Sequence, residues 1–234
     1  MQHTIGAMSG LFDIVGPVMV GPSSSHTAGA VRLAILARNI AQKPIQSVRF
    51  DLYNSFAKTY KGHGTDRGLL AGMMGFSVQD DRIRDAYSWA EKLHLEYEML
   101  PIESSNHFSP NTVVFKMILE DGENLTVVGH SIGGGKVYVS KINDYNVSLK
   151  GEFPTLLLFY KDQPGMIWQA SKVIAEKSIN IASLTCTRRK RGIEAFMSIA
   201  LDAPLPSGFL ESFREAFRQI PDVYSVRAID QLPL

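Results

Sequence analysis

Four hydroxyl side chains and an imidazole stand next to one another in the segment 21–29, GPSSSHTAG. Apolar residues follow it at i, i+3, i+4 and i+7 spacing, which predicts a helix from about Ser24 to Ala41. A helix start offers free backbone N–H groups and the positive end of the helix dipole, so it can hold a carboxylate or phosphate. An imidazole there can move a proton near pH 7. The alternative is that these residues only cap the helix. The polar side chains concerned are Ser23, Ser24, Ser25, His26 and Thr27.

A second imidazole lies between two glycines in the segment 62–66, GHGTD. Glycine tolerates positive φ and lets a backbone approach a ligand closely, so Gly62 and Gly64 favour a binding loop around His63. The alternative is a surface turn in which Thr65 or the following aspartate caps a short helix.

A glycine-rich segment, SIGGGK, covers residues 131–136. It is not a Walker loop, because His130 stands where that motif needs glycine and Val137 where it needs serine or threonine. Two interpretations stay open for Gly133 and Gly134. They form a tight turn between strands, or their backbone amides face a substrate or a partner subunit.

Taken in this order, the three segments resemble the β subunit of the iron–sulfur-dependent bacterial L-serine dehydratases, over about Gly10 to Asp230. The resemblance implies elimination of water from L-serine, giving pyruvate and ammonia. It implies His26 or His63 as the base that removes the Cα proton. The segment PNT at 110–112 also matches the family, although Ser109 stands where the family has a histidine, and His107 is therefore left out of the catalytic pair. The implied substrate-binding residues are Ser23, Ser24, Ser25, Thr27, Gly62, Gly64, Thr65, Asn111, Gly133 and Gly134.

The chain contains a single cysteine, Cys186. It can form neither an internal disulfide nor a four-cysteine metal site. Since the resembling enzymes use a 4Fe-4S cluster, the resemblance implies that the cluster ligands lie on a separate α subunit and that this chain supplies no metal ligand. The α subunit and L-serine are then the expected partners.

The 24 basic and 23 acidic residues almost balance in a chain of 234 residues. This balance gives no indication of nucleic-acid binding. No apolar run is long enough to span a bilayer, and the first residues do not resemble a signal peptide, so a cytoplasmic protein is expected.

The periodicities predict an α+β domain over residues 1–150. The sequence Asp121-Gly122 predicts a hairpin between its later strands. The expected elements are helices at 24–41 and 81–97, strands at 48–53, 112–119 and 125–128, and a further strand after Gly135.

Residues 153–230 follow the order βαββαβ of the ferredoxin-like unit and resemble an ACT domain. Self-association through this domain is expected, with Asp162 and Gly165 binding an amino-acid effector near the first strand-to-helix turn. A second function stays open. An amino-acid-sensing regulatory subunit without catalytic residues would have the same anion-binding corner and the same ACT-like segment. Similar pairs of domains occur in regulated serine-biosynthetic dehydrogenases.

Overall fold

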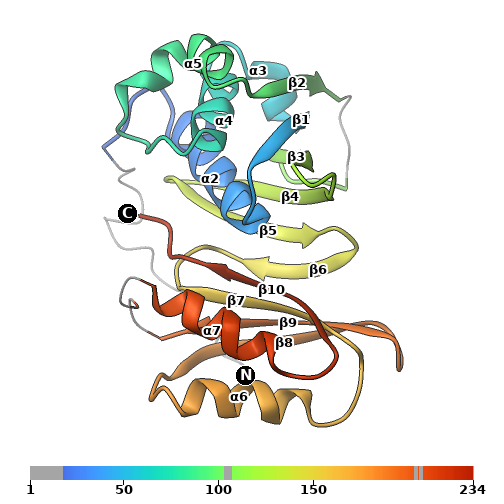
Figure 1. The fold of residues 1–234 in the computed structure, drawn as a ribbon. Coiled ribbons are helices and arrows are strands. Elements are labelled where there is room, and N and C mark those ends of the chain that lie inside the picture. Colours follow the sequence, from blue (N-terminus) through green and yellow to red (C-terminus); the bar gives the residue numbers. More distant parts are fainter. Residues whose placement is uncertain (1–17, 103–106, 203–204, 206–207, 234) are drawn as a thin grey trace, which may run out of the picture.

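The chain forms two sheets in succession (Figure 1). The computed structural model describes residues 18–102, 107–202, 205 and 208–233. The first sheet has six strands in the order β2-β1-β3-β4-β5-β6. Only the β1–β2 pair is parallel. The strands are β1 (Ile45–Asn54), β2 (Glu96–Pro101), β3 (Asn111–Leu119), β4 (Asn124–Gly133), β5 (Lys136–Ile142) and β6 (Tyr145–Leu149).

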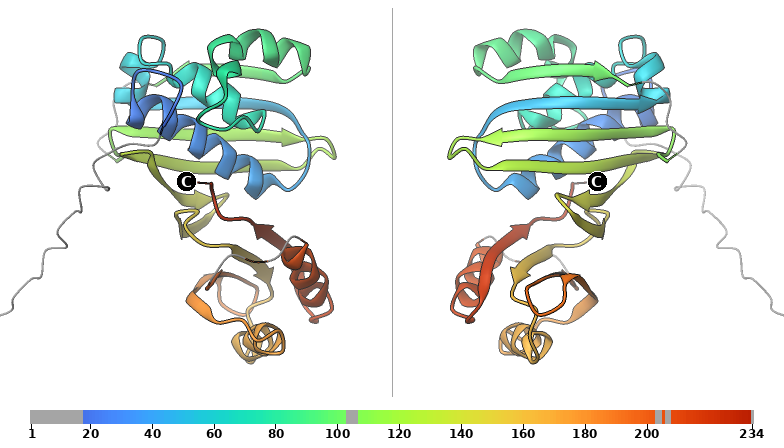
Figure 2. Two further views of the ribbon diagram at one scale, coloured as in Figure 1. Left: turned by 90° about the vertical axis from the view of Figure 1, so that its left-hand side faces the viewer. Right: turned by 90° about the vertical axis from the view of Figure 1, so that its right-hand side faces the viewer.

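Helices cover one face of this sheet and leave the other face open (Figure 2). The first of them begins with one π-helical turn and continues as the α-helix α2. Leu33, Leu36, Ala37 and Ile40 of α2 are fully buried, which confirms the predicted apolar face. The elements are the π turn η1 (Ser24–Ala28), α2 (Gly29–Ala41), α3 (Ser55–Thr59), α4 (Thr65–Met73), the 3₁₀ turn η2 (Asp81–Asp85) and α5 (Ala86–Lys92).

Helices α2 and α4 lie unusually close together because two glycines of α4 face α2. A Cβ atom at Gly72 would lie 2.2 Å from the carbonyl oxygen of Val31, and one at Gly68 would lie 2.8 Å from that of Thr27. No side chain fits into these gaps. The close contact places the turn before α4, which contains His63, beside the start of α2.

The predicted helix at 81–97 is wrong only in its last five residues, because η2 and α5 together cover Asp81 to Lys92. Helix α5 ends at Lys92, and His94 adopts a positive φ of 54°, which reverses the chain. Tyr97, the last residue of the predicted helix, lies instead in β2, where it pairs with Val48 of β1. The helical spacing of apolar residues therefore continued past the end of α5 and into β2, so the spacing alone did not locate the end of the helix.

The second sheet has the order β10-β7-β9-β8 and is antiparallel throughout. Its elements confirm the predicted βαββαβ order. They are β7 (Thr155–Tyr160), α6 (Met166–Ala175), β8 (Ile181–Lys190), β9 (Glu194–Leu201), α7 (Phe209–Arg218) and β10 (Val223–Ile229). The strand β6 before it was not predicted. It follows β5 after a short turn and pairs with it, so the break between the sheets starts only after Leu149.

The two sheets share an apolar boundary. Tyr145, Phe159 and Phe196 form a cluster with ring centroids 5.1 to 5.5 Å apart. Leu157 and Ile229, both from the second sheet, are buried in the core of the first unit. The two units therefore pack as one body across this boundary.

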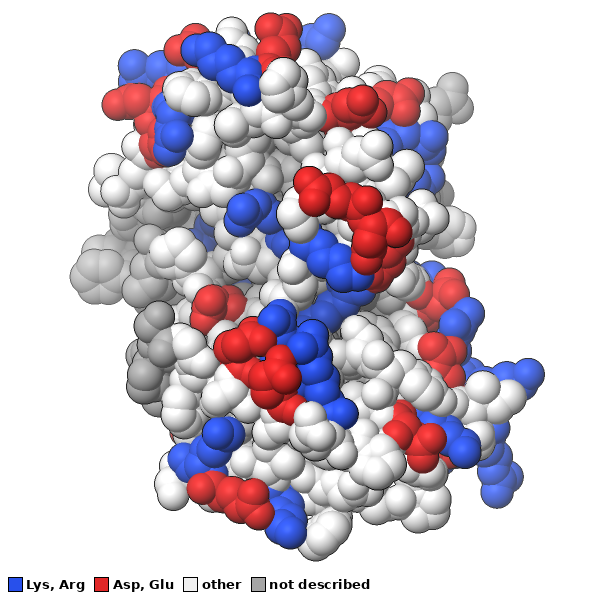
Figure 3. All heavy atoms as spheres, viewed as in Figure 1, with Lys and Arg blue, Asp and Glu red and all other residues white. Residues whose placement is uncertain are grey.

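Basic and acidic side chains alternate over the face shown in Figure 3, and neither sign gathers in a large patch. This distribution agrees with the balanced composition. Among the residues that the structure describes, no helix is long and apolar enough to cross a membrane.

Candidate functional site

The site is built on the first turn of the helix that follows Pro22. Ser23 caps it, and the Ser23 Oγ atom accepts a hydrogen bond from the backbone N–H of His26 at 3.1 Å. The N–H groups of Thr27 and Ala28 both donate to the carbonyl of Ser23, at 2.8 and 3.2 Å, which makes this turn wider than an α-helical one. Such π turns are rare and are often found at functional sites.

Both ring nitrogens of His26 face hydroxyl groups. The Nδ1 atom lies 3.0 Å from Ser25 Oγ and 3.4 Å from Ser23 Oγ. The Nε2 atom lies 3.2 Å from the Oγ atom of Ser55, at the start of α3. The imidazole is therefore held from two sides by neutral groups that can both donate and accept a hydrogen bond.

The second predicted histidine lies beside the first. The ring centroids of His26 and His63 are 4.8 Å apart and their planes meet at 70°. The Thr27 hydroxyl donates to the carbonyl of His63 at 2.8 Å, which fixes the His63 turn to the helix start. Two segments 36 residues apart in the sequence thus meet in one cluster.

The environment lowers the pKa of His26. Burial is the main cause, and the neighbouring His63 adds to it. Because the usual value is near 6.5, the imidazole of His26 is neutral at pH 7 and can accept a proton. His63 is exposed at the edge of the cluster.

The segment 131–136 forms the tight turn between β4 and β5. Gly133, Gly134 and Gly135 all have positive φ, at 95°, 58° and 74°. The end of β4 contacts the helix start, because Ser131 Oγ donates to the carbonyl of Ser25 at 2.8 Å. A Cβ atom at Gly29, the first residue of α2, would lie 2.2 Å from Ser131 Oγ. The close approach of β4 to the start of α2 therefore requires glycine at this position.

The other predicted substrate-binding residues occupy varied positions. Gly64 has a positive φ of 68°, whereas Gly62 does not, so only one of the two glycines is required by backbone conformation. The Thr65 hydroxyl and Asn111 Oδ1 are buried and have no hydrogen-bond partner within the described part of the chain. They are polar atoms available to a ligand or water. Ser24 lies in the π turn, where its carbonyl accepts the N–H of Gly29.

Sequence reasoning missed two residues of the cluster. Ser55 contacts His26 directly, and the ring of Phe56 packs on it with centroids 5.4 Å apart. The available signal was the polar pair Asn54-Ser55 at the end of β1, since functional side chains often lie at strand ends and in the loops that follow them. His130, just before the glycine-rich segment, is buried and lies within hydrogen-bond distance of Thr112 Oγ1 and Ser140 Oγ, at 2.8 and 2.7 Å.

The donor set of this chain does not fit an iron–sulfur cluster. The only cysteine, Cys186, is exposed on β8 of the second sheet. Within the described ranges no three His, Cys, Asp or Glu side chains gather as metal ligands. A four-cysteine cluster needs ligands from another chain.

The predicted effector residues line a hollow of about 700 Å³ in the second unit. Gly165 has a φ of 90° and lies directly before α6, with open space beside its Cα atom. Asp162 is already paired, because it contacts Arg188 Nε at 2.8 Å and accepts the N–H of Gly192 at 2.7 Å. Of these two residues, Gly165 is therefore the one that an effector can approach.

A family model described as serine dehydratase beta chain matches residues 10–141. The chain belongs to the serine dehydratase beta chain family. A second model, the ACT domain, matches residues 155–218, so the βαββαβ unit is an ACT domain.

Curated relatives agree with the family match. The L-serine dehydratase beta chain of Peptoniphilus asaccharolyticus is 39% identical over 83% of this chain and 87% of its own length. A probable L-serine dehydratase beta chain of Bacillus subtilis is 36% identical over 94% of this chain and 97% of its own. A D-3-phosphoglycerate dehydrogenase of Bacillus subtilis is 25% identical over 86% of this chain, but over only 37% of its own length.

Proposed function

We propose that this chain is the β subunit of an L-serine dehydratase, which converts L-serine to pyruvate and ammonia. The observation that carries the proposal is the cluster in which His26 and the adjacent His63 meet serine and threonine hydroxyls at a helix start. The full-length similarity to beta chains of L-serine dehydratase supports the same reaction.

The reaction removes a proton from Cα and hydroxide from Cβ of serine. The resulting enamine becomes an imine, which water hydrolyses to pyruvate and ammonia. The assembled enzyme must therefore supply a base for a weakly acidic C–H bond and must hold the substrate carboxylate. His26, neutral at pH 7, is suited to be the base, and His63 is the second candidate beside it.

Substrate binding is proposed for the groups around these histidines. The helix start and its hydroxyls can hold a carboxylate through hydrogen bonds and the helix dipole. Thr65 and Asn111 are proposed as further substrate-binding residues, because the Thr65 hydroxyl and Asn111 Oδ1 have no hydrogen-bond partner among the described residues. Gly133 and Gly134 are proposed to face substrate or a partner subunit, since Ser131, just before them on β4, contacts the same helix start.

The 4Fe-4S cluster is proposed to be held by a separate α subunit, because this chain lacks the cysteines for it. The part proposed for this chain is to bind and orient serine and to accept the Cα proton. The ACT domain is proposed to self-associate and to bind an amino-acid effector at the hollow beside Gly165, since the edge strand β8 is available for pairing.

A regulatory subunit that senses an amino acid is the second candidate. The ACT domain and the similarity to a D-3-phosphoglycerate dehydrogenase favour it. The difference from the first proposal is that a regulatory subunit would transfer no proton through His26 or His63.

The test is anaerobic co-expression with the candidate α subunit and measurement of pyruvate formed from L-serine. We expect His26→Ala or His63→Ala to lower kcat by about 100-fold or more, which is the usual effect of losing a general base. His94→Ala is the matched control, because this histidine lies in the turn after α5. An active complex in which both site variants turn over like the wild type would favour the regulatory role.

A further inference from the structure

The residue that ends strand β1 has a strained backbone. Asn54 has φ 54° and ψ −118°, a combination that residues with a side chain rarely adopt. Such a conformation persists only where the surrounding structure enforces it, and it is frequent at functional sites. The strain lies one residue before Ser55, whose hydroxyl contacts His26.

The neighbouring loop enforces this bend with hydrogen bonds. The Asn54 Nδ2 atom donates to the carbonyls of Phe108 and Ser109, at 2.8 and 3.2 Å. The backbone N–H of Ser55 donates to the carbonyl of Pro110 at 2.8 Å. The bend is thus fixed from both its side chain and its backbone.

The fixed bend brings Ser55 to the ring nitrogen of His26 that points away from the helix start. Ser23 and Ser25 contact Nδ1, and Ser55 contacts Nε2. Within the described part of the chain, hydroxyls and not a carboxylate bond to this imidazole, unlike the histidine of a catalytic triad. The tautomer and orientation of His26 therefore depend on these hydroxyls.

We propose that Ser55 is the positioning residue for His26 and that the strained Asn54 bend, fixed by the 108–110 loop, sets the place of its hydroxyl. This inference rests on the proposed function of His26 as a base. When the imidazole accepts a proton, both of its nitrogens become donors, and the oxygens of Ser25 and Ser55 accept from them. A hydrogen bond to a charged donor is stronger than one to a neutral donor, so Ser55 favours the protonated ring.

The experiment uses the assembled α–β complex with Ser55→Ala and Ser55→Thr. We expect Ser55→Ala to lower kcat by about 10-fold with little change in KM, and to move the acidic limb of the kcat/KM profile to lower pH by about half a unit. Ser55→Thr keeps the hydroxyl and should restore both values. Ser140→Ala is the matched control, because it removes a hydroxyl from the Nε2 atom of a different histidine, His130.

A second pair of variants tests the bend. Asn54→Gly tolerates the positive φ but loses the hydrogen bonds from the Asn54 side chain to the loop. Asn54→Ala loses the same hydrogen bonds and also strains the backbone, because alanine rarely adopts a positive φ. We expect kcat to fall in the order wild type, Asn54→Gly, Asn54→Ala. Equal activity of all three would show that the bend does not position Ser55.

A labelling measurement separates this inference from the proposed function. Diethylpyrocarbonate modifies neutral imidazoles, so the pH dependence of labelling at His26, read by peptide mass spectrometry, reports its pKa without turnover. In Ser55→Ala the midpoint should move to lower pH. An unchanged midpoint and an unchanged pH profile would overturn the role of Ser55, even in an active complex. If the complex is inactive on L-serine but Ser55→Ala still shifts the midpoint of His26 labelling, the proposed reaction is rejected. The role of Ser55 in positioning His26 would then stand.

Discussion

Individual ionisable residues of this chain lie in opposite environments. His26 is half-buried among neutral hydroxyls, and burial lowers its pKa. Asp51, on the open face of the first sheet, is buried but lies between two cations. The first environment favours an uncharged group that can accept a proton, and the second favours a permanent charge.

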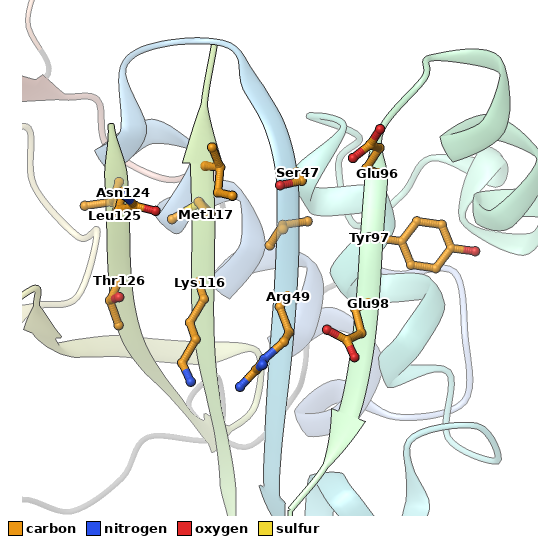
Figure 4. A pocket seen from close by; sticks show the side chains of 12 residues that line it. Ser47, Arg49, Glu96, Tyr97, Glu98, Lys116, Met117, Asn124, Leu125 and Thr126 are labelled. Atoms are coloured by element: carbon orange, nitrogen blue, oxygen red, sulfur yellow. The ribbon is translucent and has the colours of Figure 1, made fainter. Parts of the chain in front are cut away.

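The Asp51 carboxylate holds the open face together. Arg49 Nε lies 2.7 Å from one of its oxygens and Lys116 Nζ lies 2.7 Å from the other. Figure 4 shows Arg49 and Lys116 pointing toward each other from neighbouring strands, with Glu98 beside them. Burial alone would raise the pKa of Asp51, but the hydrogen bonds and charges of Arg49 and Lys116 outweigh it and the pKa is lowered.

This lowered pKa predicts a pH-dependent contribution to stability. The folded chain binds a proton at Asp51 less readily than the unfolded chain does, so the contribution is full above about pH 5 and is lost as pH falls through the folded pKa. We expect Asp51→Asn to lower the free energy of unfolding by about 1–2 kcal/mol at pH 7, less at pH 4. Urea unfolding at both pH values measures the difference.

The control for this prediction is Asp81→Asn. Asp81 is exposed and lies 3.5 Å from Arg84 one helical turn away. Exposed pairs of this kind contribute little, so this variant should unfold like the wild type at both pH values. A pH-independent loss in Asp51→Asn would show that packing, and not charge, is what the carboxylate contributes.

At the scale of elements, the site depends on how closely α4 approaches α2. The two glycines of α4 that face α2 allow this approach, and the His63 turn precedes α4 directly. A helix moved outward by even a fraction of an ångström would carry His63 away from His26. The geometry of the site is therefore set by backbone contacts outside it.

Gly72→Ala tests this close approach. Alanine normally favours a helix over glycine by about 1 kcal/mol, but here its Cβ would lie 2.2 Å from a backbone carbonyl that cannot rotate away. We expect a net destabilisation of about 1–3 kcal/mol, measured by thermal unfolding. Gly62→Ala is the control, because its nearest contact would be at 3.8 Å and its φ is not positive. Equal stability of the two variants would mean that the helices can separate freely.

The elements also show what a sequence can predict. The start of α2 was predictable because capping residues and an apolar period coincide within about 20 residues. The contact of Ser55 with His26 was not, since it depends on the Asn54 bend and on a loop more than 50 residues away in the sequence. The error at the end of the predicted helix 81–97, which stops at Lys92, has a similar cause. After α5 the chain turns at His94, which has a positive φ that its residue type did not predict. The strand that follows, β2, is specified by its pairing with β1.

On the scale of the whole molecule, α2 connects the site to the ACT domain. Its first residues follow the π turn that carries His26, and its last carbonyls, at Ile40 and Ala41, accept hydrogen bonds from Arg227 of β10. Gln42, directly after the helix, bonds to the backbone N–H and carbonyl of Ala228. The C-terminal end of α2 is therefore fixed by the second sheet.

Arg227 makes two kinds of interaction at this boundary. It is 8% exposed, donates to the negative end of the α2 dipole and forms an ion pair with Glu123 of the first unit. Its removal leaves the last carbonyls of α2 without their side-chain donor. It also takes away one of the two cations that pair with Glu123, the other being Lys43. A stability effect larger than that of a surface ion pair follows.

We expect Arg227→Met, which keeps much of the side-chain volume, to lower the free energy of unfolding by about 1–3 kcal/mol. Arg218→Met is the matched control, because Arg218 forms an exposed pair with Glu215 on α7 and should contribute less than about 0.5 kcal/mol. Calorimetry of the full chain measures both. Because the two units share an apolar boundary, the wild type should unfold in one transition, and Arg227→Met should broaden or split it. A variant that unfolds at the wild-type temperature in one sharp transition would show that the apolar contacts alone join the ACT domain to α2.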